Sequence, residues 1–130
     1  MIEHPHLAVF GRIYDAFADG DLDSLAALFK EEVVWHTPGR NPLAGDYEGR
    51  DAVLASFAEE FDLSQGSYRV HVHDVLANDQ HIVALLRASA SRDERTLDMN
   101  YVLVFEMKDG RVAEAWESWA DQRTLDDFWS

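Results

Sequence analysis

Residues 96–121 read TLDMNYVLVFEMKDGRVAEAWESWAD, and this stretch decides the fold. Apolar and polar side chains alternate on both sides of Asp109-Gly110, a dipeptide typical of tight hairpin turns. The alternation predicts two long antiparallel strands, from Thr96 to Met107 and from Arg111 to Asp121. A sheet with one apolar face needs a second layer to cover that face.

The same period of two extends back to the region of Gly66 and predicts two earlier strands, Tyr68 to Leu76 and His81 to Ala90, with a turn at Asn78-Asp79. The four strands form an antiparallel meander. Before Gly66 the apolar side chains recur at helical spacing instead, so helices are expected to supply the covering layer.

The N-terminal half predicts three helices around one short strand. Its elements, in order, are a helix from Pro5 to Ala18, a short helix after Asp21 ending near Phe29, a strand from Val33 to Thr37, a loop from Arg40 to Glu48 and a helix from Asp51 to Phe61. Leu125 to Trp129 could add one closing helical turn. This order predicts an α+β fold over residues 1–130, a single domain in which three N-terminal helices pack on a curved antiparallel sheet. Such a cone encloses a cavity, which is a natural ligand site.

Charge and composition exclude several classes of function. The 130 residues carry 25 acidic and 11 basic side chains, a formal net charge of -14, and this polyanion disfavours nucleic acid and anionic membranes as partners. Without cysteine, disulfides and thiolate metal sites are excluded. The first residues lack the features of a signal peptide, and no apolar run approaches the roughly 18 residues of a membrane helix, so a cytoplasmic location is expected.

Several motifs resemble the SnoaL-like family of the nuclear-transport-factor-like superfamily, which includes ketosteroid isomerase. They are ADGDLDSLAALF at 18–29, WHTPG at 35–39, YEGRDAV at 47–53, and DGRV at 109–112 through WAD at 119–121. The resemblance implies a cone-shaped, cystatin-like roll and a homodimer joined through the outer face of the sheet. It leaves the function open among isomerases, cyclases, epoxide hydrolases, dehydratases and non-enzymatic binders.

The position of Asp121 depends on the register of the last hairpin. A two-residue loop would place Asp121 opposite Asp98, whereas a three-residue loop with Gly110 in a bulge would place it opposite Leu97. The bulged register separates apolar from polar side chains better, so it is the register predicted here.

In that register Asp121 and Glu117 point into the cone, where burial would raise a carboxyl pKa and suit general acid or base catalysis. The resemblance also implies a catalytic Asp at this point of the last strand, although Asp121 could equally cap a backbone amide or face water. Glu117 is expected to hydrogen-bond Tyr101 or to have no catalytic part. The predicted substrate-binding wall consists of Phe17, Trp35, Thr37, Phe57, Met99, Tyr101, Glu117 and Trp119.

Two departures argue against particular activities within the superfamily. Thr37 stands where ketosteroid isomerases carry their catalytic Asp, and Ile13 stands where they carry an oxyanion tyrosine. The Arg-x-Asp of the epoxide hydrolases is absent from residues 97–100. His36 should point away from the cavity, and its position beside a proline turn is more typical of a structural role.

Two further patterns concern metals and assembly. His71-x-His73 has a spacing that can hold a metal, but Arg69 shares its face and no third ligand is evident, so neither a metal nor a cofactor is predicted. The outer sheet face carries Val102, Val104, Val112 and Trp116, and an apolar patch without a covering helix predicts a homodimer.

Taken together, these features favour a cofactor-independent enzyme that acts on a small hydrophobic molecule, with Asp121 moving a proton during cyclisation, isomerisation or hydration. The alternative is a non-catalytic domain that uses the same cavity for small-molecule binding or interaction. The segment from Pro42 to Tyr47 could close over the mouth of the cavity.

Overall fold

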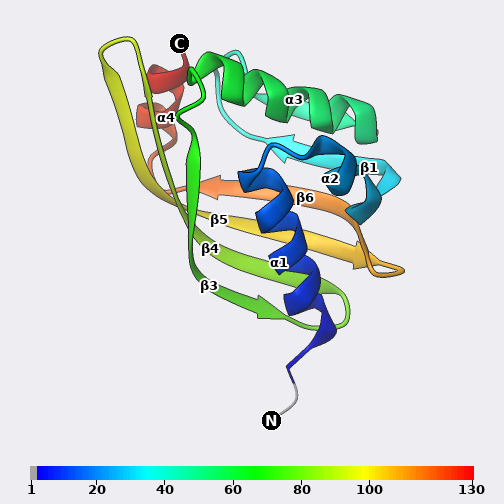
Figure 1. The fold of residues 1–130 in the computed structure, drawn as a ribbon. Helices are drawn as coiled ribbons and strands as arrows, with labels where there is room; N and C mark the ends of the chain where they lie inside the picture. The colour runs from blue at the N-terminus through cyan, green and yellow to red at the C-terminus, as the bar shows by residue number, and fades with distance from the viewer. Residues whose placement is uncertain (1–2) are drawn as a thin grey trace.

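A computed structural model describes residues 3–130 and shows helices packed on one curved sheet (Figure 1). The elements in chain order are α1 (Pro5–Ala18), α2 (Leu22–Leu28), β1 (Phe29–Thr37), β2 (Gly45–Glu48), α3 (Arg50–Leu63), β3 (Arg69–Ala77), β4 (His81–Arg92), β5 (Arg95–Lys108), β6 (Arg111–Trp119) and α4 (Gln122–Trp129).

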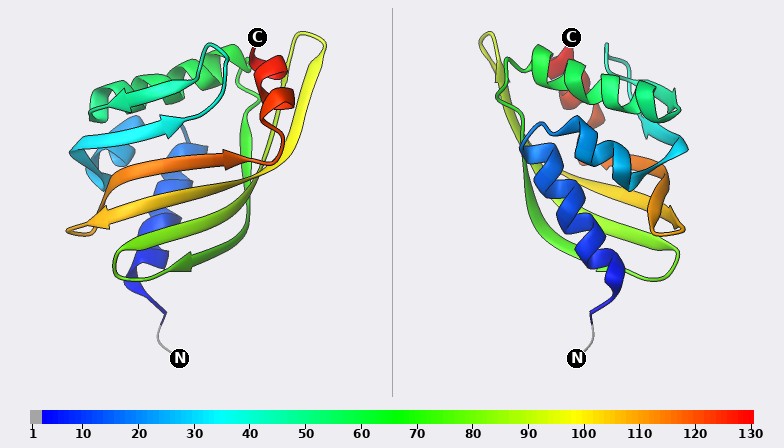
Figure 2. Two further views of the ribbon diagram at one scale, coloured as in Figure 1. Left: turned by 180° about the vertical axis from the view of Figure 1, so that it is seen from behind. Right: turned by 45° about the vertical axis from the view of Figure 1, so that its right-hand side comes forward.

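The six strands form one sheet in the order β2-β1-β6-β5-β4-β3. The sheet bends strongly, and α1, α2 and α3 lie on its concave side, as both views in Figure 2 show. The predicted α+β architecture is confirmed. Two details of the prediction are wrong: β2 forms inside the segment expected to be a loop, and β1 pairs with β6 in parallel, so the sheet is not wholly antiparallel.

The core is formed where the helical stripes meet the concave face. Phe29, Phe105 and Val53 are fully buried there, and Trp35 packs edge-on against Phe57 with 4.9 Å between ring centroids. Burying a large apolar side chain stabilises the fold by about 1.5–3 kcal/mol. The aromatic side chains of α1, α3 and β1 therefore hold the helices against the sheet.

The turn between β5 and β6 is the two-residue type. Asp109 and Gly110 both have positive φ, +54° and +76°, and Lys108 pairs directly with Arg111. These angles match the type I′ turn, whose twist suits an antiparallel hairpin. The three-residue loop predicted from the sequence is therefore wrong.

A bulge nevertheless occurs, one step beyond the turn, where the register shifts between Glu106 and Met107. As a result Tyr101 lies opposite Trp119, rather than opposite Glu117 as predicted. The alternation of faces is preserved. Val112 is fully buried, so its predicted place on the outer face is wrong.

Strand β6 ends at Trp119, and Asp121 begins α4 as its N-cap residue. The apolar side chains of α4 are buried, including Leu125 and Trp129, so the expected closing turn is a helix of two turns. Asp126 of this helix accepts a hydrogen bond from Asn41 at 2.7 Å, which ties α4 to the loop after β1. Within residues 3–130, no helix is both long and apolar enough to cross a membrane.

Candidate functional site

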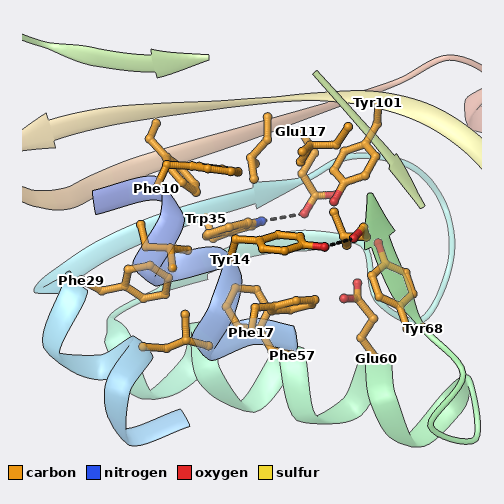
Figure 3. Close-up of a pocket in the computed structure, with 16 residues that line it drawn as sticks. Phe10, Tyr14, Phe17, Phe29, Trp35, Phe57, Glu60, Tyr68, Tyr101 and Glu117 are labelled. Carbon is orange, nitrogen blue, oxygen red and sulfur yellow. Dashed lines mark hydrogen bonds between the residues drawn. The ribbon is translucent and has the colours of Figure 1, made fainter. Parts of the chain in front are cut away.

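A cavity of about 60 Å³ lies between the helices and the concave face of the sheet (Figure 3). Aromatic rings and aliphatic side chains form most of its wall, and two carboxyl groups with three tyrosines form the rest. Its sixteen lining residues are Phe10, Ile13, Tyr14, Phe17, Leu25, Phe29, Trp35, Phe57, Glu60, Tyr68, Val70, Leu86, Tyr101, Leu103, Phe105 and Glu117.

Glu117 enters the cavity from β6 and is held by three donors. The indole N–H of Trp35 donates to Oε2 at 2.6 Å, the hydroxyl of Thr37 donates to Oε2 at 3.3 Å, and the indole N–H of Trp119 donates to Oε1 at 2.8 Å. Burial raises the pKa of Glu117, and the hydrogen bonds oppose that shift because they stabilise the charged carboxylate. The hydrogen bond to Tyr101, one of the two alternatives expected for Glu117, is wrong, because the register brings Trp119 beside Tyr101 instead.

Glu60 enters the same cavity from α3, on the side opposite Glu117 (Figure 3). Burial raises its pKa well above the ordinary value, and the nearby charge of Glu117 raises it further. None of the described residues that line the cavity is Lys or Arg. Burial and the charge of Glu117 therefore both favour the protonated form of Glu60, which can donate a hydrogen bond or a proton.

Tyrosine hydroxyls complete the polar end of the cavity. Burial raises the pKa of the Tyr68 and Tyr101 phenols well above 10, so both remain protonated. Tyr14 donates its hydroxyl to the carbonyl oxygen of Val70 at 2.8 Å. The polar groups thus gather at one end, opposite a wall of phenylalanine rings.

Asp121 lies outside this cavity, so its predicted inward position and raised pKa are wrong. Its carboxylate is exposed and accepts hydrogen bonds from the backbone N–H of Thr124 at 3.2 Å and from the Thr124 hydroxyl at 2.8 Å. These bonds lower the pKa of Asp121. Strand β6 ends at Trp119, before Asp121, so Asp121 takes the capping role that was the alternative interpretation.

Of the predicted wall, five residues line the cavity: Phe17, Trp35, Phe57, Tyr101 and Glu117. Met99, Thr37 and Trp119 do not line it. Thr37 and Trp119 contact the site through Glu117, and Trp119 also stacks on Tyr101 with 4.0 Å between ring centroids and 10° between planes.

The sequence analysis missed Glu60, although a signal was present. Glu60 follows Val53 and Phe57 at helical spacing, so the carboxyl interrupts the apolar stripe of α3. A charged residue on a core-facing stripe indicates either a partner or a functional cavity.

His36 faces away from the cavity, as predicted. Its two ring nitrogens lie 2.6 Å from carboxylate oxygens of Asp46 and Glu114, and its ring stacks on Trp116. The hydrogen bond to Glu114, followed by that to Asp46, raises the pKa of His36.

His71 and His73 line a groove on the outer face, and within residues 3–130 no cluster of three or more His, Cys, Asp or Glu side chains could hold a metal ion.

The comparisons with known proteins agree with this fold. The sequence profile of the SnoaL-like domain matches residues 10–115. An uncharacterized protein of Mycobacterium tuberculosis strain H37Rv is 32% identical over 131 residues, with all of both chains covered. The chain belongs to the SnoaL-like family.

Solved structures extend the comparison. Bal32a, from a soil-derived mobile gene cassette, is 36% identical with a TM-score of 0.93, and the match covers 96% of each chain. IdmH from Streptomyces antibioticus, a candidate polyketide cyclase, is 19% identical with a TM-score of 0.77, covering 94% of this SnoaL-like chain and 96% of IdmH. At that identity IdmH shares the fold only.

Proposed function

We propose that this SnoaL-like protein is a cofactor-independent acid–base enzyme that acts on a small, uncharged, largely apolar molecule. Glu117 is the general base and Glu60 the general acid. The observation that carries the proposal is that two carboxyl groups face one apolar cavity in unequal surroundings. Such a pair provides an acid and a base at the same pH.

The assignment of the two roles follows from the hydrogen bonds. Glu117 accepts three of them, and each stabilises its ionised form. Burial and the charge of Glu117 both disfavour the ionised form of Glu60. Glu117 therefore loses its proton first, and the resulting negative charge keeps the proton on Glu60.

The lining also restricts the ligand. A carboxylate or phosphate would be repelled by Glu117 acting as an ionised base, and none of the described lining residues is a cation that could compensate its charge. The phenylalanine and tryptophan rings favour an apolar body, and the tyrosines and Glu60 favour an oxygen acceptor at the other end. A cavity of about 60 Å³ holds only a few heavy atoms, so a larger substrate requires the aromatic wall to move.

Cyclisation, isomerisation and hydration all need a proton removed at one atom and supplied at another, which is the chemistry that this pair provides. The candidate polyketide cyclase IdmH has the same fold. Asp121, the acid–base residue expected from the sequence, is not part of the proposal because it caps α4 at the surface.

The test is solvent deuterium exchange into a panel of small neutral ketones and lactones, followed by mass spectrometry. Glu117→Gln should slow exchange by roughly 10²–10⁴-fold, the usual contribution of a general base. Asp121→Asn is the control and should leave the rate unchanged. Binding of panel members without exchange would overturn the proposal and favour the non-catalytic binding domain.

A further inference from the structure

We propose that Trp119 is a positioning residue that orients the Glu117 carboxylate so that Oε1, rather than Oε2, exchanges the proton. The inference rests on the proposed role of Glu117. It concerns a side chain that does not line the cavity and touches the site only through its indole N–H and its stacked ring.

The two oxygens of Glu117 differ in how many donors they accept. Oε2 accepts the indole N–H of Trp35 at 2.6 Å and the hydroxyl of Thr37 at 3.3 Å. A carboxylate offers about four lone-pair sites, two on each oxygen, so Oε2 is filled. Among the described residues, Oε1 accepts only the indole N–H of Trp119, at 2.8 Å, which leaves one lone pair for a proton.

The geometry of β6 explains why Trp119 can hold this oxygen. Trp119 follows Glu117 by two residues, so both side chains leave the strand on the same face. The register sets Trp119 opposite Tyr101, and the two rings stack at 4.0 Å. The stack fixes the indole plane, and the N–H then fixes the rotation of the carboxylate.

Trp35 has a different role, because it is part of the wall itself. Its ring packs against Phe57 at 4.9 Å, Phe105 at 5.6 Å and Phe29 at 6.0 Å. Replacing Trp35 would change the shape of the cavity. Replacing Trp119 by Phe keeps an aromatic ring on Tyr101 and removes mainly the N–H donor, so Trp119→Phe isolates the hydrogen bond.

Loss of a hydrogen bond to a charged group should raise the pKa of Glu117 by about one to two pH units. Thr37→Val is the matched control, since it removes the long 3.3 Å donor from the filled oxygen and preserves side-chain volume. Its effect should be smaller, because a longer hydrogen bond stabilises the carboxylate less.

The experiment is a pH titration of the tryptophan indole N–H signals by ¹⁵N-resolved NMR on the whole protein. In the wild type, Trp35 and Trp119 should titrate with one shared midpoint, and Glu117→Gln should abolish both titrations. The Trp119 signal should move further than the Trp35 signal, because the proton arrives on the oxygen that Trp119 contacts. Trp129, buried in α4, is the internal reference.

In Trp119→Phe, the midpoint reported by Trp35 should rise by about one pH unit or more. An unchanged midpoint in Trp119→Phe would overturn the positioning role. Separate midpoints for the two indoles in the wild type would overturn it as well. A larger chemical-shift change for Trp35 than for Trp119 would assign the proton to Oε2. The wild-type titration decides the question even if Trp119→Phe does not fold. Shared indole titration combined with full exchange activity in Glu117→Gln would instead overturn the proposed function.

Discussion

Replacing Glu60 by Gln should make the protein more stable at neutral pH and weaken the dependence of its stability on pH. The folded chain holds the Glu60 proton at pH values where the unfolded chain, with a pKa near 4.5, has released it. The folded state therefore binds more protons, and the free energy of unfolding falls as pH rises from about 4.5 to the raised folded pKa. One such group gives a slope of up to about 1.4 kcal/mol per pH unit.

Glu117 contributes in the same direction, because burial also raises its pKa. Glu60→Gln should remove the contribution of Glu60 to the change of unfolding free energy with pH and leave the contribution of Glu117. The assay is urea denaturation followed by tryptophan fluorescence at several pH values between 4.5 and 8. The gain in stability should grow with pH and become constant above the folded pKa of Glu60.

Glu59→Gln is the matched control, since it makes the same substitution at an exposed position of the same helix. It should leave the slope almost unchanged. If Glu60→Gln and the wild type give parallel lines across the whole range, Glu60 is ionised in the folded state, and its assignment as the neutral acid fails.

Three further predictions concern the surface. Asp121→Ala should lower the free energy of unfolding, measured in urea, through loss of the α4 cap, whereas unchanged stability would contradict the cap. Hydrogen bonds to Glu114 and Asp46 raise the pKa of His36 in the folded chain. The contribution of His36 to the free energy of unfolding is therefore complete below pH 6.5 and declines as pH rises through the folded pKa. Urea denaturation of His36→Gln at several pH values should lack this decline. The outer face exposes Trp116, 38% accessible, and light scattering should give a dimer that Trp116→Glu weakens, whereas a wild-type monomer at micromolar concentration would refute the interface.

The hairpin β5–β6 shows what the alternation of apolar and polar residues can predict and what it cannot. Alternation predicted both strands and the shared face of Tyr101 and Trp119, because side-chain direction has a strict period of two. The alternation did not predict that Tyr101 pairs with Trp119. A bulge in the turn and a bulge one step beyond the turn leave the same alternation along the rest of both strands, but they give different pairs. The burial of Val112 favours the second position, and that burial exists only once the chain has folded.

The cavity likewise has features that the sequence predicted and features that it did not. The family motifs and apolar stripes were sufficient to predict a cone with an aromatic cavity, and Phe17, Trp35 and Phe57 line it. The interpretation of Asp121 failed because strand length decides whether a terminal carboxylate faces inward or caps the next helix. No local pattern fixes where β6 stops and α4 starts.

The amino-acid sequence by itself determined the three N-terminal helices, the four long strands, most of their apolar faces and the acidic charge, because these follow from side-chain type and short-range spacing. Only the tertiary structure decided which carboxyl groups meet. Glu60 on α3 and Glu117 on β6 are far apart along the chain, and the packing of that helix over the concave sheet brings them to one cavity. Their unequal pKa shifts arise from burial and from the donors of Trp35 and Trp119, which exist only once the chain has folded.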